Sequence, residues 1–418
     1  MMSLRTELGA TDKVADQHEI PTGTTVVRDL PPDTHNTWEQ RVEAVVAVAR
    51  EHADDVDRQG RFPHEAIGEC RRQRIFGAVV PQARGGRAVS IVELCALIEE
   101  LGRVCGSTAA IVAMHFSQEL CLTRHVDLEQ ESALTAVTER VAAEQWLLAS
   151  STTEKNIGGD TRTSSCAVVE NGDGTVTVCK SAPVISYARY ADAILVTARR
   201  HPEAPSSEQV LVVAPKSALK LDRTTPWDAL GLRGTMSEGF ELEATVSADH
   251  VLPVDFATIS SHTMLPASHT LWASSWLGLA SAAGDLARKF VQKKARATPG
   301  ELPPGALRLA ELEIELQRMT DVVRVNVRRF ADQADDVSVL GSMPFAIAMN
   351  TLKVSTSELV RQIVGDAMVI VGIASYSNTG PWSLARPLRD AMGPSLQVNN
   401  DRILKNTATL QMVSRGRR

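Results

Sequence analysis

The amino-acid sequence predicts an α+β protein made of an N-terminal helical domain, a middle antiparallel β domain and a C-terminal helical bundle. Three observations predict this order. Hydrophobic residues recur with a helical period from Trp38 to about Val141, and short alternating runs separated by turn residues follow from Trp146 to Leu252. From Ser261 onward the period is helical again. One block of strands between two blocks of helices favours an α+β fold over alternating βαβ units.

The bulk composition is typical of a soluble globular protein. The chain has 418 residues, 44% of them hydrophobic and 22% charged, with a formal net charge of −6. This charge gives no reason to expect nucleic acid as a partner. The six cysteines show no metal-binding spacing, so we expect reduced thiols, a cytoplasmic location and no metal site. The polar N-terminus is not a signal peptide, and the longest apolar run, at 367–374, is too short to span a membrane.

The first two predicted regions precede the strands. Residues 1–35 are polar and contain the loop signals PTGTT and LPPDTHN, so we expect a flexible N-terminal arm. Residues 36–143 should form the N-terminal helical domain. Its helices are expected over residues 38–56, 62–75, 89–104 and 106–125, and the last is apolar on nearly every side, which predicts a buried helix.

The remaining chain divides at about residue 260. Residues 144–260 should form the β domain, with strands in WLLASST, SCAVVE, GTVTVCK, ADAILVTAR, QVLVVAP and GFELEATV. The NGDG segment at 171–174 predicts a hairpin between the second and third of these strands. Residues 261–418 should form a bundle of long helices, with helices over 269–296, 306–335 and 344–372 and a last one from near Asn400.

Four motifs, in order along the chain, resemble those of the acyl-CoA dehydrogenase superfamily. They are GAVVPQARGGR in the first helical domain, TEKNIGGD at 153–160, GLRGT at 231–235 and LARPLRDAMG at 384–393. The resemblance covers roughly residues 38–415. It implies a flavin-dependent oxidoreductase, a homotetramer that binds FAD, or FMN in its place, across a subunit interface. The flavin pocket would lie between the β domain and the C-terminal bundle.

The resemblance also implies which residues contact the flavin through its β-domain face. Thr153 would hydrogen-bond the pyrimidine edge of the flavin, and the backbone of Gly158 and Gly159 would approach the cofactor or thioester. The family has a serine at the position of Gly159, so one hydroxyl is lost here. Ser186, in ISYARYAD, matches the hydroxyl beside flavin N5 and O4.

Three more cofactor contacts are implied by the C-terminal part of the chain. Arg296 matches an arginine that contacts the flavin pyrophosphate of a neighbouring subunit, although a solvated helix-end cation would look the same in sequence. Gly372 is all that remains of the family's Gln-Gly-Gly-x-Gly segment, which predicts loose FAD binding. Asn400, at the start of the last helix, is a further cofactor-binding candidate.

The catalytic base is where the sequence departs from the family. Dehydrogenases of the family remove the α proton of a thioester with a glutamate, commonly about nine residues after the arginine of the Arg-Asp segment. Counting from Arg389 gives Val398, and the family's second location matches Ser268. Neither residue is a base, and proton abstraction needs one. Asp401 and His269 are the nearest substitutes.

Four functions therefore remain open. The first is a flavin monooxygenase, in which His115 would match a histidine of the family's oxygenase branch, although a lone histidine in an apolar helix is more often a core residue. The second is decarboxylating oxidation of a β-keto acid. The third is α,β-dehydrogenation of an acyl thioester with Asp401 or His269 as the base. The fourth is a non-catalytic flavin-fold binding protein.

The predicted substrate is a small acyl or carrier-tethered metabolite of specialised metabolism, and an acyl carrier protein or a flavin reductase is a candidate partner. Arg233, in the GLRGT turn, is expected to be a pocket-lining or a structural cation. Trp272 and Trp276 are four residues apart on one helical face, so they line the substrate tunnel or belong to the core.

Overall fold

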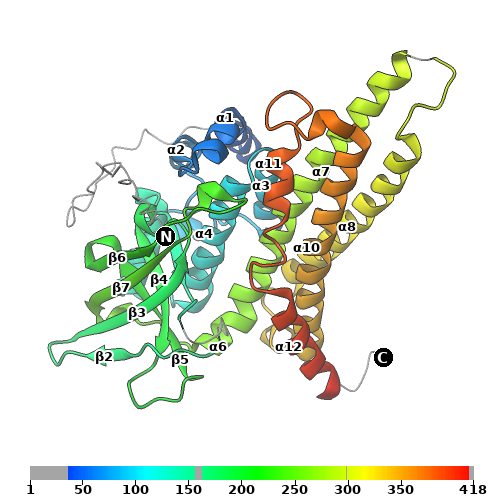
Figure 1. The fold of residues 1–418 in the computed structure, drawn as a ribbon. Helices are drawn as coiled ribbons and strands as arrows, with labels where there is room; N and C mark the ends of the chain where they lie inside the picture. Colours follow the sequence, from blue (N-terminus) through cyan, green and yellow to red (C-terminus); the bar gives the residue numbers. More distant parts are fainter. Residues whose placement is uncertain (1–35, 156–161, 298, 414–418) are drawn as a thin grey trace, which may run out of the picture.

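The computed structural model, which describes residues 36–155, 162–297 and 299–413, confirms the α+β architecture (Figure 1). The predicted arm at 1–35 lies outside the described residues. A helical layer comes first, and α1 opens it with a capping box in which Thr37 and Gln40 exchange hydrogen bonds. Its helices are α1 (Trp38–Gln59), α2 (His64–Arg72), α3 (Ile91–Val104), α4 (Gly106–His125) and α5 (Ala133–Glu144).

Two sheets follow. The first has the order β1-β4-β5 and contains β1 (Leu148–Ser151), β4 (Ala193–Arg199) and β5 (Gln209–Pro215). The second has the order β2-β3-β7-β6 and contains β2 (Val168–Glu170), β3 (Thr175–Ile185), β6 (Leu219–Thr225) and β7 (Glu238–Ser247). The pairing is antiparallel except between β1 and β4, which run parallel. The NGDG segment joins β2 to β3 as predicted, with positive φ at Gly172 and Gly174.

One strand was not predicted from the sequence. β6, with the sequence LKLDRTT, forms the edge of the second sheet and pairs only with β7. Most of its residues are exposed, so its charged and polar side chains carry no apolar alternation. The buried strands β4 and β5 have the opposite character, and their apolar runs, which are covered on both faces, predict them from sequence.

The C-terminal part is a bundle around one long helix. α7 (Leu265–Ala297) packs against α3, α8 (Ala306–Gln333) and α10 (Met343–Val371), and Figure 1 shows α7, α8 and α10 side by side. The short α6 (Phe256–Ile259) and a π-helical turn, η6 (Ser260–Met264), lead into α7. The shorter helices are α9 (Val337–Leu340), α11 (Ala385–Ala391) and α12 (Asn400–Val413). Within the described ranges, no helix is long and apolar enough to cross a membrane.

The α3–α7 contact brings two backbones unusually close. A Cβ on Gly102 of α3 would lie 2.2 Å from the carbonyl oxygen of Ser275, and a Cβ on Gly278 of α7 would lie 2.0 Å from that of Glu99. Only glycine allows this approach. The crossing therefore sets the position of α7, whose first turns form part of the cavity described next.

Candidate functional site

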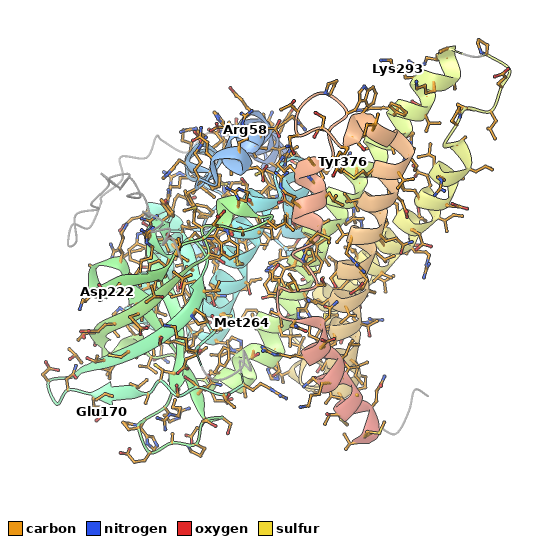
Figure 2. The ribbon with its side chains drawn as sticks, in the orientation of Figure 1. Arg58, Glu170, Asp222, Met264, Lys293 and Tyr376 are labelled. Atoms are coloured by element: carbon orange, nitrogen blue, oxygen red, sulfur yellow. The ribbon has the colours of Figure 1, made fainter. Side chains whose placement is uncertain are left out.

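A cavity of about 550 Å³ lies where the β domain meets α4 and the start of α7. This volume falls within the range of about 300–1,000 Å³ that is usual for small-molecule sites. Met264, which ends the π-helical turn and lines the cavity, lies at this junction (Figure 2). The remaining walls come from α4, the ends of β1 and β3, the segment 227–237 and the 389–398 segment around the end of α11.

Hydroxyl groups gather on the β-domain wall. Ser186 Oγ lies 2.8 Å from Ser237 Oγ, and Ser237 Oγ lies 2.8 Å from Thr235 Oγ1. Thr235 Oγ1 also donates to the carbonyl oxygen of Leu232 over 2.8 Å. Each hydroxyl has one proton, so Thr235 must accept from Ser237, and Ser237 must accept from Ser186. The chain of bonds leaves Ser186 Oγ with free lone pairs, and Ser186 lines the cavity.

Thr153 lies on the same wall. Its Oγ1 donates to the carbonyl oxygen of Val184 over 2.9 Å, so it also keeps lone pairs for a ligand. Gly158 and Gly159, predicted from the same motif, lie outside the described residues.

His269 lies on the opposite, α7 wall. Its Nδ1 is 3.0 Å from the carbonyl oxygen of Met349, which can only accept, so Nδ1 carries the proton. Burial, opposed by the Met349 hydrogen bond and aided by the nearby Lys353 charge, lowers the pKa of His269 to about 4. The imidazole is therefore neutral near pH 7, and Nε2 is an acceptor.

Both positions at which the family carries its base line this cavity. Val398 and Ser268 are wall residues, and no carboxylate is among the lining residues in the part of the chain that the structure describes. Ser268 Oγ lies 2.7 Å from Ser117 Oγ. Val398 has φ 48°, which is strained for a β-branched residue and is typical of functional sites.

A buried lysine, which the sequence reasoning missed, holds the Val398 loop in place. Lys353 Nζ donates to Val398 O over 2.9 Å and to Asn400 Oδ1 over 2.7 Å. Burial lowers the pKa of Lys353 to about 8. The Asn400 amide also donates to Ser357 and Glu358, so Asn400 fixes α12 and does not line the cavity. The sequence feature that could have identified Lys353 is a lysine within the apolar run of α10.

Several predicted residues lie elsewhere in the structure. Asp401 is exposed in the first turn of α12, away from the cavity lining. His115 is fully buried and accepts from the Leu148 N–H over 3.0 Å, and its Nε2 lies 3.0 Å from Glu119 but is misaligned for a hydrogen bond. His115 thus joins α4 to β1 and does not line the cavity. We carry neither residue forward as catalytic.

The three residues predicted to bind substrate have different positions in the structure. Trp272 lines the cavity, whereas Trp276 is buried in the core, where its ring centroid is 6.0 Å from Lys353 Nζ. Arg233 ties the turn η4 (Arg233–Thr235) to α1, because its Nε donates to Asp57 O over 2.8 Å and its Nη1 to Ala229 O over 2.9 Å. Of the two roles predicted for Arg233, the geometry matches the structural one.

Arg296 and Gly372 lie far from the cavity. Arg296 is exposed 24 residues after Trp272 on α7, about 36 Å along the helix. Gly372 follows the end of α10, with positive φ and open space around its Cα. Their predicted contacts belong to a neighbouring subunit, so they stay predictions.

Asp390 anchors the GLRGT turn from beneath. Its Oδ1 accepts from the Leu232 N–H over 2.7 Å, and burial raises the pKa of its carboxyl to about 6 against the attraction of Arg386. Because the folded-state pKa lies above the unfolded value of about 3.9, ionisation costs stability. The protonated form contributes fully below about pH 4, and its contribution is lost as the pH rises through 6.

We therefore expect Asp390→Asn to remove a pH-dependent loss of stability. Asparagine keeps the acceptor for Leu232 without the charge. The free energy of unfolding of the variant, relative to the wild type, should therefore rise by about 2–3 kcal/mol as the pH increases from 4 to 7. Urea unfolding across this pH range measures it. The exposed Asp401→Asn is the control, with an unchanged profile. Parallel curves for wild type and Asp390→Asn would contradict the assignment.

Two family models match the chain. "Acyl-CoA dehydrogenase, N-terminal domain" matches residues 32–139, and "Acyl-CoA dehydrogenase, C-terminal domain" matches residues 261–396. These ranges cover most of the first helical layer and most of the C-terminal bundle, on either side of the strands.

Characterised relatives and solved structures resemble nearly the whole chain. An L-evernosamine nitrososynthase from Micromonospora sp. is 28% identical over 81% of this chain and 80% of its own. A cyclohex-1-ene-1-carbonyl-CoA dehydrogenase from Geobacter metallireducens is 24% identical over 84% of this chain and 90% of its own. FMN-bound TdsC, a dibenzothiophene monooxygenase from Paenibacillus sp. A11-2, superposes with a TM-score of 0.77 at 16% identity, covering 89% of this chain and 97% of its own.

Proposed function

The chain belongs to the acyl-CoA dehydrogenase superfamily, and from this premise we propose that it is a flavin-dependent monooxygenase of small metabolites. It is an oxidoreductase of a flavin-using family. The proposal concerns which oxidation it performs. The observation that carries it is the absence of any carboxylate among the described cavity-lining residues, with valine and serine at both base positions.

The cavity residues fit a flavin, and they fit its reduced form best. Ser186, Thr153 and their neighbours Ser150 and Thr152 line one wall with hydroxyl groups. Ser186 Oγ is left as an acceptor, and reduced flavin carries an N–H at N5 where oxidised flavin has a lone pair. Reduced flavin supplies two electrons to O₂, so that one oxygen atom enters the substrate and the other leaves as water.

The protein's own contribution is to bind, orient and exclude water. Most of the cavity lining is apolar, and a dry site prevents wasteful release of reduced oxygen. His269, neutral and fixed by Met349, orients a substrate group without needing a proton of its own. Lys353 holds the Val398 wall closed on the other side.

Cofactor supply and assembly are part of the same proposal. FMN or FAD fits the hydroxyl wall equally, and the FMN-bound structural neighbour supports FMN as the alternative to FAD. We propose a cytoplasmic homotetramer that receives reduced flavin from a separate reductase. Arg296 and Gly372 would then meet the flavin of a neighbouring subunit, the backbone of Gly158 and Gly159 would approach the cofactor or thioester, and an acyl carrier protein stays an alternative partner.

One alternative keeps a supporting observation. His269 lines the cavity as a neutral base, so an acyl-thioester dehydrogenase would use it in place of the glutamate. A pKa of about 4 makes it a poor general base for this proton. Decarboxylation needs a cation for the carboxylate, and Arg389, which lines the cavity, is already paired with Asp57.

The test is oxygen incorporation. The protein is mixed with reduced FMN, ¹⁸O₂ and a pool of small ring compounds and acyl-CoA thioesters, and products are analysed by mass spectrometry. We expect a product with one ¹⁸O atom that forms only with folded protein and reduced FMN. A parallel reaction holds oxidised FMN and an artificial electron acceptor without O₂, and reduction of that acceptor by an acyl-CoA, with no labelled product in the first reaction, would instead show a dehydrogenase. Flavin binding with neither reaction would leave the non-catalytic binding protein.

A further inference from the structure

The α7 wall of the cavity presents hydrogen-bond acceptors to a bound molecule, together with one buried donor without a partner among the described residues, the Trp272 Nε1–H. His269 is one of the acceptors, since Nδ1 is used by Met349 O and Nε2 is left without a proton. His269 is 3% exposed and lines the cavity, so Nε2 is available to a molecule bound there. A ligand N–H or O–H would satisfy this acceptor.

Ser268, the next residue on the wall, is an acceptor for an independent reason. Ser268 Oγ lies 2.7 Å from Ser117 Oγ, and either hydroxyl can be the donor of this bond. In both directions Ser268 Oγ keeps at least one lone pair, because a hydroxyl oxygen has two. Ser268 lines the same cavity as His269. Two adjacent residues can thus accept a hydrogen bond from a ligand.

The cavity also offers little charge to a ligand. Arg389 is the one Lys, Arg, Asp or Glu side chain among its described lining residues, and it is paired with Asp57. The rest of the lining is largely apolar, with aromatic rings and methionines such as Trp272, Phe256 and Met114. An ionised ligand would lose its hydration here without a counter-ion, at a cost of several kcal/mol. Aromatic and thioether side chains instead favour contact with a flat ring.

We propose that the cavity takes an uncharged ring compound whose N–H or O–H group donates to Nε2 of His269, with Ser268 Oγ as the second acceptor. This inference names the substrate class of the proposed function and rests on it for the reaction, but not for the binding. His269 acts as a specificity-determining residue, because it distinguishes a ring with a donor from the same ring without one.

A matched trio of naphthalenes tests the inference. 2-Naphthol has a donor, 2-methoxynaphthalene has the same ring without one, and 2-naphthoate is an anion. Calorimetry is done on the full chain, with and without FMN and without O₂. We expect 2-naphthol to bind about tenfold more tightly than 2-methoxynaphthalene, the effect of one hydrogen bond, and 2-naphthoate not to bind. Equal affinities for the first two, or tighter binding of the anion, would overturn the proposal.

Variants assign the effect to the residue. His269→Phe should lower 2-naphthol affinity to that of 2-methoxynaphthalene, whose own affinity stays within about twofold. His125→Asn is the matched control, since His125 is also held neutral by burial, with a pKa of about 4, but lies outside the cavity lining. If His269→Phe does not fold, Ser268→Ala serves instead, because it should weaken only 2-naphthol. A selectivity that survives both variants would contradict the assignment.

The two proposals can fail separately. The intact order of the three naphthalenes with no ¹⁸O incorporation would overturn the monooxygenase and keep the ligand class. ¹⁸O incorporation into a charged or donor-free compound, with no selectivity for 2-naphthol, would overturn the ligand class and keep the monooxygenase.

Discussion

Acyl-CoA thioesters are expected to keep their α-hydrogens when they are incubated with this protein in D₂O. A general base contributes about 10²–10⁴-fold to such a proton transfer. Val398 and Ser268 stand at the two base positions, and no carboxylate is among the cavity-lining residues that the structure describes. Deuterium uptake into butyryl-CoA should therefore be at least about 10²-fold slower than with a family dehydrogenase that carries the glutamate. Mass spectrometry of the recovered thioester measures it.

Variants of the two candidate substitute bases are the controls for this experiment. His269→Phe removes the neutral imidazole from the cavity wall, and Asp401→Asn removes an exposed carboxylate. Neither change should alter a rate that is already at background. Rapid deuterium uptake by the wild type that disappears in His269→Phe would identify His269 as a base and return the protein to the dehydrogenases.

Gly278→Ala is expected to lower the free energy of unfolding by about 3 kcal/mol. The new Cβ would lie 2.0 Å from Glu99 O and 2.9 Å from Arg103 N, both backbone atoms that cannot turn aside. The α3 and α7 backbones would have to separate along their whole contact. Since α7 also carries Ser268 and His269, the variant should in addition lose selectivity between 2-naphthol and 2-methoxynaphthalene. Urea denaturation at constant m-value gives the stability.

Gly365 provides the matched control for this substitution. It lies within α10, where an added Cβ would meet open space. Gly365→Ala should therefore raise stability by about 0.5–1 kcal/mol, because alanine loses less backbone entropy in a helix. If Gly278→Ala were as stable as Gly365→Ala, the close α3–α7 approach would be wrong.

The site was partly predictable from local motifs. Thr153, Ser186, Trp272 and His269 were named from sequence, and the structure brings them to one cavity. Their motifs come from separate parts of the chain, and only the family resemblance predicted that they would share one pocket. Asn400, also named from sequence, does not line this cavity, and its side chain bonds to Lys353 and Glu358.

The different positions of two histidines could not be predicted from the sequence. His115 and His269 both sit in apolar helical segments, and their local sequences do not separate them. In the structure, His115 bonds to the Leu148 backbone between α4 and β1, whereas His269 lines the cavity. Which neighbour a helix face meets depends on the crossing of elements far apart in sequence, and no local pattern records that crossing.

The sequence by itself determined the order of helices and strands, the hairpin at 171–174 and the absence of a carboxylate at residues 268 and 398, the two positions that the family resemblance matches to the base. These properties depend on local hydrophobic period, turn chemistry and residue identity. Only the tertiary structure decided that Val398 and Ser268 share one cavity without a carboxylate among its described lining residues, and that Lys353 holds its wall. The physical reason is that protonation state, acceptor direction and desolvation arise from packing between distant segments, such as the Met349 carbonyl that leaves His269 Nε2 as an acceptor.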